Sequence, residues 1–349
     1  MFRVVLIEHG YASIEVERRI IEKAGGELVD ADKLPLSKAL GLCRDADGVL
    51  FRRIDMTGEM LRQFSKCRII VRYGIGTDNV DVAAATEANI IVGHVPSYCI
   101  DEVSTHAIAL LLACARKLVP TQKRMEQGSW DVHRDDPIFR LAGKTVGIVG
   151  LGNIGRAVAR KLSGWNMKLI ASDPFVDHER ARESGVELVD FETLCRSSDF
   201  VTLHCPLLPE TRHLINAKSL NWMRGGTVIV NTARGSVIDQ GALLKAMDSG
   251  HVASAALDVF EREPLAPDSP LRRHPRVVVT DHTAWYSEES QAELQRTAAE
   301  ELARVCAGGL PRSLANPEVI ERLGRMKEWE PGENMLWQLK RLRALGRLA

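Results

Sequence analysis

Three side chains that could hold an anion and move a proton each follow a short β-branched run in the C-terminal half of the chain. They are Arg234, Glu263 and His282. A histidine exchanges protons near neutral pH, and a carboxylate beside it stabilises the charged imidazolium. An arginine stabilises negative charge that develops on a substrate oxygen. The set predicts acid–base chemistry on an anionic substrate, although an arginine in such a position can equally form only a surface ion pair.

A glycine-rich motif separates the apolar run 146–149 from the helical pattern 156–162. In a G-x-G-x-x-G motif of this kind, the first glycine permits a tight turn and the second lets the backbone approach a pyrophosphate. The third lets the helix pack closely on the strand, and the phosphate lies at the helix N-terminus. The alternative is a turn with a purely structural role. The predicted cofactor-binding residues of this motif are Gly150, Leu151, Gly152, Asn153, Ile154 and Gly155.

An acidic residue ends the next predicted strand, residues 168–171, about twenty positions past the glycines. There Asp173 would accept hydrogen bonds from the adenosine ribose and would repel a 2′-phosphate. Pro174 and Phe175 follow it, rather than an arginine that could neutralise such a phosphate. Asp173 therefore favours NAD as the cofactor. The alternative is that Asp173 serves only as a helix cap or turn residue.

The composition limits the class of protein. A chain of 349 residues is about twice the length of a typical domain, which favours two globular domains. Its 46 basic and 46 acidic side chains give no net charge, so we expect neither nucleic acid nor a membrane surface as a partner. Hydrophobic residues at 45% and charged residues at 26% are typical of a soluble globular protein.

Targeting and metal-binding signals are weak. The most apolar stretch, residues 107–115, is far shorter than the roughly 20 residues of a membrane span, and the N-terminus leads directly into a strand pattern. Seven scattered cysteines without C-x-x-C spacing indicate neither disulfides nor zinc, so we expect a cytoplasmic protein. His94, His106 and His133 lack metal-ligand spacing, and we interpret them as packing or surface residues with no metal site.

Short β-branched runs alternate with helical windows in two series, between residues 4 and 92 and again between residues 145 and 279. This alternation predicts an α/β protein with two doubly wound domains, each built on a parallel sheet. A long helical window over residues 101–118 joins the series. The second series carries the glycine motif and is the predicted nucleotide-binding domain.

The segment after Trp285 contains one long helical pattern, residues 288–305, and no further strand. Because a lone helix must pack on an existing core, we expect it to return to the first domain. The predicted domains are therefore a discontinuous substrate domain, residues 1–100 with 285–349, and an inserted domain, residues 101–284. A final segment, residues 325–349, is apolar enough to pack as a helix, and its role is not readable from the sequence.

Taken together, these motifs resemble the D-isomer-specific 2-hydroxyacid dehydrogenase family, from Val4 to about Asn316. The resemblance rests on the glycine motif, on Asn-Thr-Ala-Arg-Gly at 231–235, on Leu-Asp-Val-Phe at 257–260 with Glu263-Pro264, and on His282. Within the family, residues 68–81 and 282–288 are closest to the C-terminal-binding-protein branch, which includes animal corepressors and bacterial enzymes.

The resemblance implies a Rossmann NAD-binding domain inserted in a flavodoxin-like substrate domain. It implies that Arg234 holds the substrate carboxylate and carbonyl and that His282 moves the proton. Glu263 would hold the other ring nitrogen of His282 and stabilise the imidazolium. Further cofactor contacts implied by the resemblance come from His204, Cys205, Pro206, Thr211, Thr232, Ala233, Arg234, Asp258 and His282.

Substrate contacts are implied for two further regions. Backbone N–H groups of the loop formed by Tyr73, Gly74, Ile75 and Gly76 would hold the substrate carboxylate, with Arg72 as a second cation. Trp285 matches a tryptophan that favours 2-oxo acids with an extended or thioether side chain. The alternatives are a surface ion pair for Arg72 and a core aromatic for Trp285. The helix at 101–118 corresponds to a linker helix that contributes to a homodimer.

The expected function is reversible hydride transfer between NADH and C2 of a 2-oxo acid. The alternative is an NAD(H)-responsive binding protein related to the corepressors. Formate oxidation is a third possibility, but formate dehydrogenases of the family carry glutamine where Glu263 stands.

Asp281 replaces a proline common in the family. It could perturb His282, but adjacent strand residues point to opposite faces, so we expect Asp281 to face solvent. The particular 2-hydroxy acid and the physiological direction are not readable from the sequence.

Overall fold

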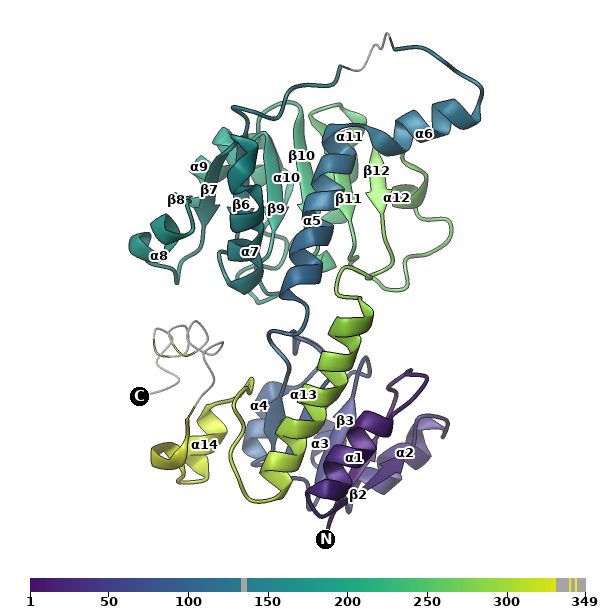
Figure 1. Cartoon of the computed structure of the whole chain (residues 1–349), viewed down its shortest axis with the longest axis vertical. Coiled ribbons are helices and arrows are strands. Elements are labelled where there is room, and N and C mark those ends of the chain that lie inside the picture. The colour runs from purple at the N-terminus through teal and green to yellow at the C-terminus, as the bar shows by residue number, and fades with distance from the viewer. Residues whose placement is uncertain (133–136, 331–338, 340–342, 344–349) are drawn as a thin grey trace. The chain divides into compact units, whose positions relative to one another are not determined.

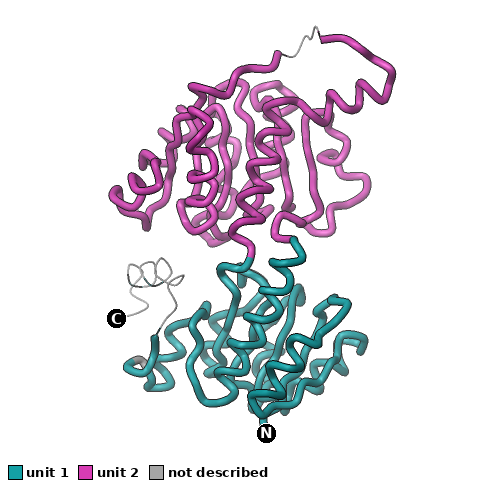
Figure 2. Tube along the Cα trace, in the orientation of Figure 1, with its two compact units in different colours: residues 1–98, 287–349 teal, residues 99–286 magenta. Residues whose placement is uncertain are grey.

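The computed structural model describes the whole chain except residues 133–136, 331–338, 340–342 and 344–349. The chain divides into two compact units, residues 1–98 with 287–349 (unit 1) and residues 99–286 (unit 2), which Figure 2 shows in two colours. Each unit is a parallel sheet with helices packed on it (Figure 1). The predicted α/β class with two doubly wound sheets is confirmed.

Unit 1 contains a five-stranded sheet in the order β2-β1-β3-β4-β5, which is the flavodoxin-like order. Its strands are β1 (Phe2–Leu6), β2 (Gly26–Asp30), β3 (Gly48–Phe51), β4 (Ile69–Arg72) and β5 (Ile91–Gly93). Its helices are α1 (Glu15–Lys23), α2 (Leu36–Cys43), α3 (Gly58–Leu61), α4 (Val82–Glu87), α13 (Glu288–Cys306) and α14 (Glu318–Arg322), followed by η3 (Met326–Glu328). The long helix α13 packs on β3, β4 and α1, and the opposite face is covered by α2, α3 and α4.

Unit 2 contains a seven-stranded sheet in the order β12-β11-β10-β9-β6-β7-β8. This is the Rossmann order with one added strand. Its strands are β6 (Thr145–Val149), β7 (Lys168–Ser172), β8 (Glu187–Leu188), β9 (Phe200–Leu203), β10 (Thr227–Asn231), β11 (Val252–Leu257) and β12 (Val277–Val279).

The helices of unit 2 cover both faces of this sheet. They are α5 (Ile100–Ala115), α6 (Leu118–Glu126), α7 (Asn153–Leu162), α8 (His178–Glu183), α9 (Phe191–Ser197), α10 (Ala217–Trp222), α11 (Gln240–Asp248) and α12 (Pro270–Arg273), with short 3-10 turns η1 (Ser163–Trp165) and η2 (Gly235–Val237). One apolar core lies under α5 and α7 and another under α10 and α11. Because both faces are buried, the strands are almost continuously apolar.

The predicted helix over residues 101–118 is interrupted. The helix α5 ends at Ala115, Lys117 takes a left-handed conformation with φ of 53°, and α6 begins at Leu118. Among the described residues, no single helix is long and apolar enough to cross a membrane; α5 and α6 meet that criterion only as a pair, bent by 58°. The face of α5 that includes Leu110 and Leu111 is buried in the core of unit 2.

Two strands and part of the tail differ from what the sequence predicted. The edge strands β2 and β8 were not expected, because β2 alternates buried and exposed residues and β8 has only two residues. Most of the expected C-terminal helix, residues 325–349, falls outside the described residues. Of its described part, Trp329 is buried and its indole N–H donates to the Pro311 carbonyl oxygen at 2.9 Å.

Candidate active site

The turn from β6 into α7 carries the glycine motif. Gly150 has φ of +89°, and a Cβ there would lie 2.7 Å from the backbone nitrogen of Cys205. At Gly155 a Cβ would lie 2.2 Å from the Gly150 carbonyl oxygen, so neither position accepts a side chain. A Cβ on Gly152 would meet nothing within 4 Å. The loop is therefore tight at its ends and open at its middle glycine, which fits a pyrophosphate at the start of α7.

Asp173 lies at the end of β7 and shapes the same loop. Its Oδ2 accepts a hydrogen bond from the backbone N–H of Leu151 at 2.8 Å, and its Oδ1 accepts one from Phe175 at 2.9 Å. The carboxylate therefore acts as a turn residue, one of the two roles considered for it. Because it is held beside the glycine motif, it also lies where an adenosine ribose would be bound in this fold.

Two buried polar atoms at the ends of β9 and β10 have no hydrogen-bond partner in the described part of the chain. They are Nδ1 of His204 and Oγ1 of Thr232. Burial lowers the pKa of His204 to about 3, so its ring is neutral, and its Nε2 contacts Thr202 Oγ1 at 2.9 Å. Buried polar groups are normally paired, so these atoms fit a ligand with polar groups at this sheet edge.

The loop after β9 is closed by its own hydrogen bonds. Thr211 Oγ1 donates to the Pro206 carbonyl oxygen at 2.6 Å and accepts from the backbone N–H of Leu208 at 2.8 Å. Cys205 is buried against Gly150. The predicted cofactor residues of this loop therefore shape the wall beside the glycine motif.

Arg234 is presented by a turn that Asn231 builds at the end of β10. Asn231 Nδ2 donates to the Arg234 carbonyl oxygen at 2.9 Å, and its Oδ1 accepts from the Ala233 N–H at 3.0 Å. A Cβ on the following Gly235 would lie 1.8 Å from the carbonyl carbon of Phe260. Only glycine allows this contact, which joins the turn to the segment after β11.

Glu263 and His282, which the sequence predicts to be an acid–base pair, lie in contact. Glu263 Oε2 lies 2.7 Å from His282 Nδ1, and Glu263 Oε1 accepts from the Phe260 N–H at 2.9 Å. Burial acts to raise the pKa of Glu263, but the hydrogen bond and charge of His282, the Phe260 N–H and the charge of Arg234 outweigh it, so that pKa is lowered. Glu263 is therefore an ionised partner that occupies Nδ1 and leaves His282 Nε2 to exchange a proton.

Asp258 holds the loop that presents His282. This carboxylate is only 1% exposed; its Oδ1 accepts from the Thr280 hydroxyl at 2.6 Å and the Thr283 N–H at 2.9 Å, and its Oδ2 accepts from the Ala284 N–H at 3.1 Å. His282 itself has φ of 58° and donates its N–H to the Asp258 carbonyl oxygen. Both carboxylate oxygens of Asp258 are in hydrogen bonds to the loop, and the cofactor contact expected for Asp258 stays a prediction.

His106 on α5 extends this network and was interpreted from the sequence as a packing or surface residue. Its Nε2 lies 3.2 Å from Thr280 Oγ1 and 3.7 Å from Asp258 Oδ1. Its partner Thr280 is 174 positions away in the sequence, so no local signal could have identified the pairing. His94 is buried with Nδ1 2.8 Å from the Ile75 carbonyl oxygen, and burial lowers its pKa. His133 falls outside the described residues.

Residues flanking His282 differ in exposure. Asp281 is exposed, as expected. Trp285 is partly buried, and its ring meets Tyr286 edge-on with centroids 5.5 Å apart. No group of His, Cys, Asp or Glu side chains in the described ranges could hold a metal ion.

The predicted substrate loop of unit 1 follows β4. Gly74 has φ of +140°, and a Cβ there would lie 1.6 Å from Arg72 Nη1, so the glycine is what lets the guanidinium lie over the loop. The backbone N–H groups of Gly74, Ile75 and Gly76 donate to no acceptor within the described ranges. The loop therefore offers donors of the kind that bind a carboxylate.

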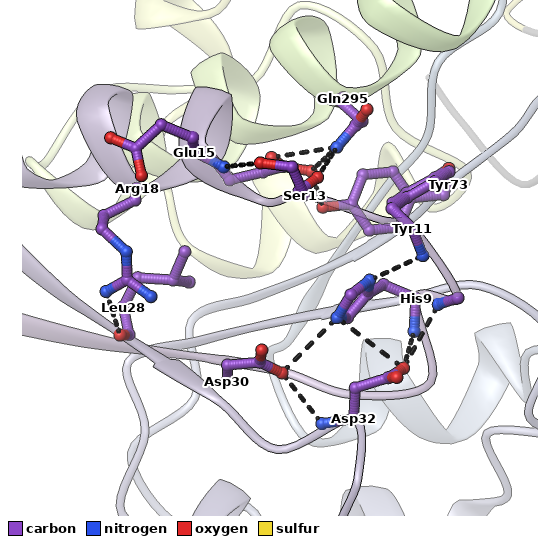
Figure 3. Close-up of polar contacts among 12 residues, drawn as sticks. His9, Tyr11, Ser13, Glu15, Arg18, Leu28, Asp30, Asp32, Tyr73 and Gln295 are labelled. Carbon is purple, nitrogen blue, oxygen red and sulfur yellow. Dashed lines mark hydrogen bonds and ion pairs between the residues drawn. The ribbon is translucent and has the colours of Figure 1, made fainter.

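Tyr73 differs from the expectation that it contacts substrate. It is 2% exposed, its N–H donates to the Phe51 carbonyl oxygen, and its hydroxyl donates to Glu17 at 2.8 Å. The side chain therefore points into unit 1. Beside it, Tyr11 meets the Tyr73 ring edge-on with centroids 5.3 Å apart (Figure 3), and the Arg52 guanidinium lies 5.2 Å from the centre of the Tyr11 ring.

Comparison with known proteins identifies relatives over most of the chain. Residues 108–284 match the sequence model described as D-isomer specific 2-hydroxyacid dehydrogenase, NAD binding domain. The chain is 38% identical over 89% of its length to a D-3-phosphoglycerate dehydrogenase of Methanocaldococcus jannaschii and covers 60% of that protein. It is 38% identical over 83% of its length to a glyoxylate reductase of Korarchaeum cryptofilum and covers 89% of that protein.

A solved structure shows the same likeness. The crystal structure of a glyoxylate reductase from Paecilomyes thermophila matches 91% of this chain and 99% of its own, with a TM-score of 0.83 and 28% identity. The chain spans only 60% and 50% of the lengths of two phosphoglycerate dehydrogenases that it matches. The narrower resemblance to the C-terminal-binding-protein branch stays a prediction. On the family match and these relatives, the chain belongs to the D-isomer-specific 2-hydroxyacid dehydrogenase family.

Proposed function

We propose that this protein is an NAD-dependent D-2-hydroxyacid dehydrogenase, which interconverts a 2-oxo acid and the corresponding D-2-hydroxy acid. The observation that carries the proposal is the contact of 2.7 Å between Glu263 and His282 Nδ1, in the unit that also holds the glycine motif. A paired histidine with its second nitrogen available suits a reaction in which a proton moves together with a hydride.

Bound NADH would supply the hydride that adds to C2 of the 2-oxo acid. The His282 imidazolium donates a proton from Nε2 to the carbonyl oxygen, while Glu263 keeps Nδ1 protonated and stabilises the positive ring. Arg234 stabilises the negative charge that develops on that oxygen. In the oxidative direction the neutral His282 accepts the hydroxyl proton at Nε2.

The residues proposed to hold the cofactor belong to unit 2. The loop from Gly150 to Gly155 would bind the pyrophosphate, and Asp173 would accept hydrogen bonds from the ribose. The unpartnered polar atoms of His204 and Thr232 would meet polar groups of the cofactor near the same sheet edge. The remaining contacts implied by the resemblance, Leu151, Asn153, Ile154, Cys205, Pro206, Thr211, Ala233 and Asp258, would act mainly by shaping the walls.

The proposed substrate contacts divide by role. The N–H groups of Gly74, Ile75 and Gly76 bind the substrate carboxylate, with the Arg72 guanidinium as its counter-charge. Trp285 covers the substrate side chain, which favours 2-oxo acids with an extended side chain.

We also propose that the protein is a cytoplasmic homodimer. Five large apolar side chains are exposed in the segment that includes α6 and the chain after it, and exposed large apolar side chains are typical of interfaces. They are Leu118 (57% exposed), Met125 (44%), Trp130 (88%), Val132 (80%) and Phe139 (64%). All seven cysteines are buried free thiols, which suits a reducing compartment.

The test follows NADH oxidation with a panel of 2-oxo acids, from glyoxylate and pyruvate to 4-methylthio and phenyl side chains. We expect turnover of at least one, a D-configured product, and loss of turnover in His282→Ala with NADH binding retained. A protein that binds NADH but turns over no member of the panel would instead support the alternative, an NAD(H)-responsive binding protein.

A further inference from the structure

A carboxylate outside the proposed catalytic set is completely buried in unit 1. Glu17 on α1 is 0% exposed. Its Oε1 accepts a hydrogen bond from the Tyr73 hydroxyl at 2.8 Å, and Gln295 Nε2 lies 2.9 Å from Oε1 and 3.2 Å from Oε2. Burying a carboxylate is costly unless hydrogen bonds compensate, so a side chain of this type in a core requires a reason.

The partners of Glu17 come from three elements of unit 1. Tyr73 directly follows β4, Gln295 lies on α13, and Gln295 Nε2 also donates to the Ser13 carbonyl oxygen at 2.9 Å, just before α1. Figure 3 shows Gln295, Ser13 and Tyr73 close together, with Tyr11 beside Tyr73. The carboxylate therefore joins both helices on this face of the sheet to the residue that begins the substrate loop.

The Tyr73 hydroxyl is a permanent donor in this arrangement. Burial, with the charge of Glu17 as the next cause, raises the pKa of Tyr73 well above its usual value. The hydroxyl therefore keeps its proton at any pH at which the protein is assayed. Tyr73 cannot release the Glu17 carboxylate by titration, so the hydrogen bond is a fixed restraint.

The residues after Tyr73 are held in part through their backbone: the Gly74 carbonyl oxygen accepts from the Val95 N–H at 3.0 Å, and the Ile75 carbonyl oxygen lies 2.8 Å from His94 Nδ1. Gly74 has no side chain and takes a positive φ, and Gly76 likewise has no side chain. The position of the three N–H groups at Gly74, Ile75 and Gly76 therefore depends on these two contacts and on what holds Tyr73 at the start of the loop. Two contacts hold the Tyr73 side chain on this face of unit 1: the hydrogen bond to Glu17 and the edge-on contact of its ring with Tyr11.

We propose that Glu17 is a positioning residue for substrate binding, which acts through the Tyr73 hydroxyl to hold the loop at Gly74, Ile75 and Gly76. The inference rests on the proposed function, in that this loop binds the substrate carboxylate. In this role Glu17 contacts Tyr73 and does not itself contact substrate or cofactor. Its loss should weaken substrate binding and leave the chemical step in place.

The experiment compares Glu17→Met, Tyr73→Phe and the double variant in the full-length protein saturated with NADH. We expect each single variant to raise KM for a 2-oxo acid about tenfold, while kcat stays within about twofold and the Kd for NADH is unchanged. Because both changes break one hydrogen bond, the double variant should be no worse than the worse single variant. Glu17→Gln keeps an acceptor oxygen for Tyr73 and should restore KM to within about threefold.

Tyr11→Phe is the matched control. Like Tyr73→Phe, it removes a hydroxyl from a buried tyrosine. The Tyr11 oxygen, however, has no hydrogen-bond partner in the described part of the chain. We expect its KM to stay at the wild-type value. A KM in Tyr11→Phe that rises as much as in Tyr73→Phe would overturn the proposal, because the effect would then not come from the Glu17 bond. Equal losses in KM, kcat and NADH binding in Glu17→Met would also overturn it, since they indicate a general structural defect.

Amide hydrogen exchange of the peptide containing residues 73–76, measured with NADH and no substrate, separates two kinds of failure. Faster exchange in Glu17→Met together with a raised KM supports the proposal. Unchanged exchange overturns the positioning role and leaves the proposed function intact. Faster exchange with an unchanged KM overturns the role of Glu17 in substrate binding. It also shows that the loop does not bind the substrate carboxylate, so that this part of the proposed function is wrong.

Discussion

Two loops assigned to the reaction are each held by a buried carboxylate, but by different kinds of donor. In unit 2, Asp258 accepts two hydrogen bonds from backbone N–H groups within the loop at residues 280–284 and one from a threonine hydroxyl in the same loop. In unit 1, Glu17 accepts from the side chains of Tyr73 and Gln295, and no backbone donor to it is found among the described residues.

The difference suits what each loop has to do. Backbone N–H groups are present whatever side chains surround them, so a loop tied through its own backbone keeps one geometry. His282 needs this, because a left-handed conformation at φ of 58° costs about 1–2 kcal/mol for a residue other than glycine. A loop tied through side chains can be adjusted by changing one partner. We therefore expect damage at Asp258 to reduce kcat and damage at Glu17 to raise KM.

The largest effect should follow Asp258→Ala. The change leaves two backbone N–H groups and the Thr280 hydroxyl without their acceptor, at about 1–3 kcal/mol for each buried group. With His282 no longer held, we expect kcat to fall by about 10²- to 10³-fold, as for loss of general acid catalysis. Asp258→Asn keeps one acceptor oxygen, so its kcat should fall less than that of Asp258→Ala. Steady-state kinetics measure this loss of kcat. A raised KM with an unchanged kcat would contradict the expectation that Asp258 affects kcat and Glu17 affects KM.

Trp285, directly after the loop that Asp258 holds, should control substrate size. Loss of about 100 Å² of contact in Trp285→Ala corresponds to about 2.5 kcal/mol, near a hundredfold in kcat/KM for a bulky 2-oxo acid. Glyoxylate or pyruvate should lose far less, because they have little side chain to cover. The measurement is kcat/KM of wild type and variant on one small and one large substrate. Equal losses on both would mean that Trp285 supports the loop rather than the substrate.

The preference for NADH or NADPH tests whether Asp173, which holds the glycine loop, also binds the adenosine ribose. We expect a preference for NADH over NADPH, and Asp173→Ala should narrow that preference by about tenfold because the repulsion of a 2′-phosphate is removed. The readout is the ratio of kcat/KM for the two cofactors. If wild type uses NADPH as well as NADH, the role given to Asp173 is wrong, and Arg180 and Arg182 become candidates for binding the phosphate.

The smallest effect should be a displaced pH profile in Glu263→Gln. The lowered pKa of Glu263 keeps this carboxylate ionised throughout the neutral range, where, in the proposed mechanism, its charge stabilises the His282 imidazolium that donates the proton. Without that charge the protonated form of the proton donor is less stable, so the alkaline limb of the reduction profile should move to lower pH. An alkaline limb that stays in place or moves upward would count against the pair.

The sequence by itself was sufficient for the features that local backbone geometry determines. The turn at Gly150 and Gly155 needs residues without side chains, and the spacing of the glycines in the motif predicted this turn. The alternation of strands and helices predicted two doubly wound sheets, because both faces of a parallel strand are buried and its residues are accordingly apolar. The edge strands β2 and β8 were missed for the same reason, since they are short or half-exposed and lack that pattern.

Only the tertiary structure decided which distant side chains meet. Glu17 reaches Tyr73 and Gln295 across 56 and 278 positions, and His106 reaches Thr280 across 174. A buried hydrogen bond depends on which faces of two elements are packed together and on the rotamers that the packing allows. Neither appears in the spacing of residues along the chain, so a glutamate on α1 looks like any other helical surface residue until the fold places a tyrosine hydroxyl against it.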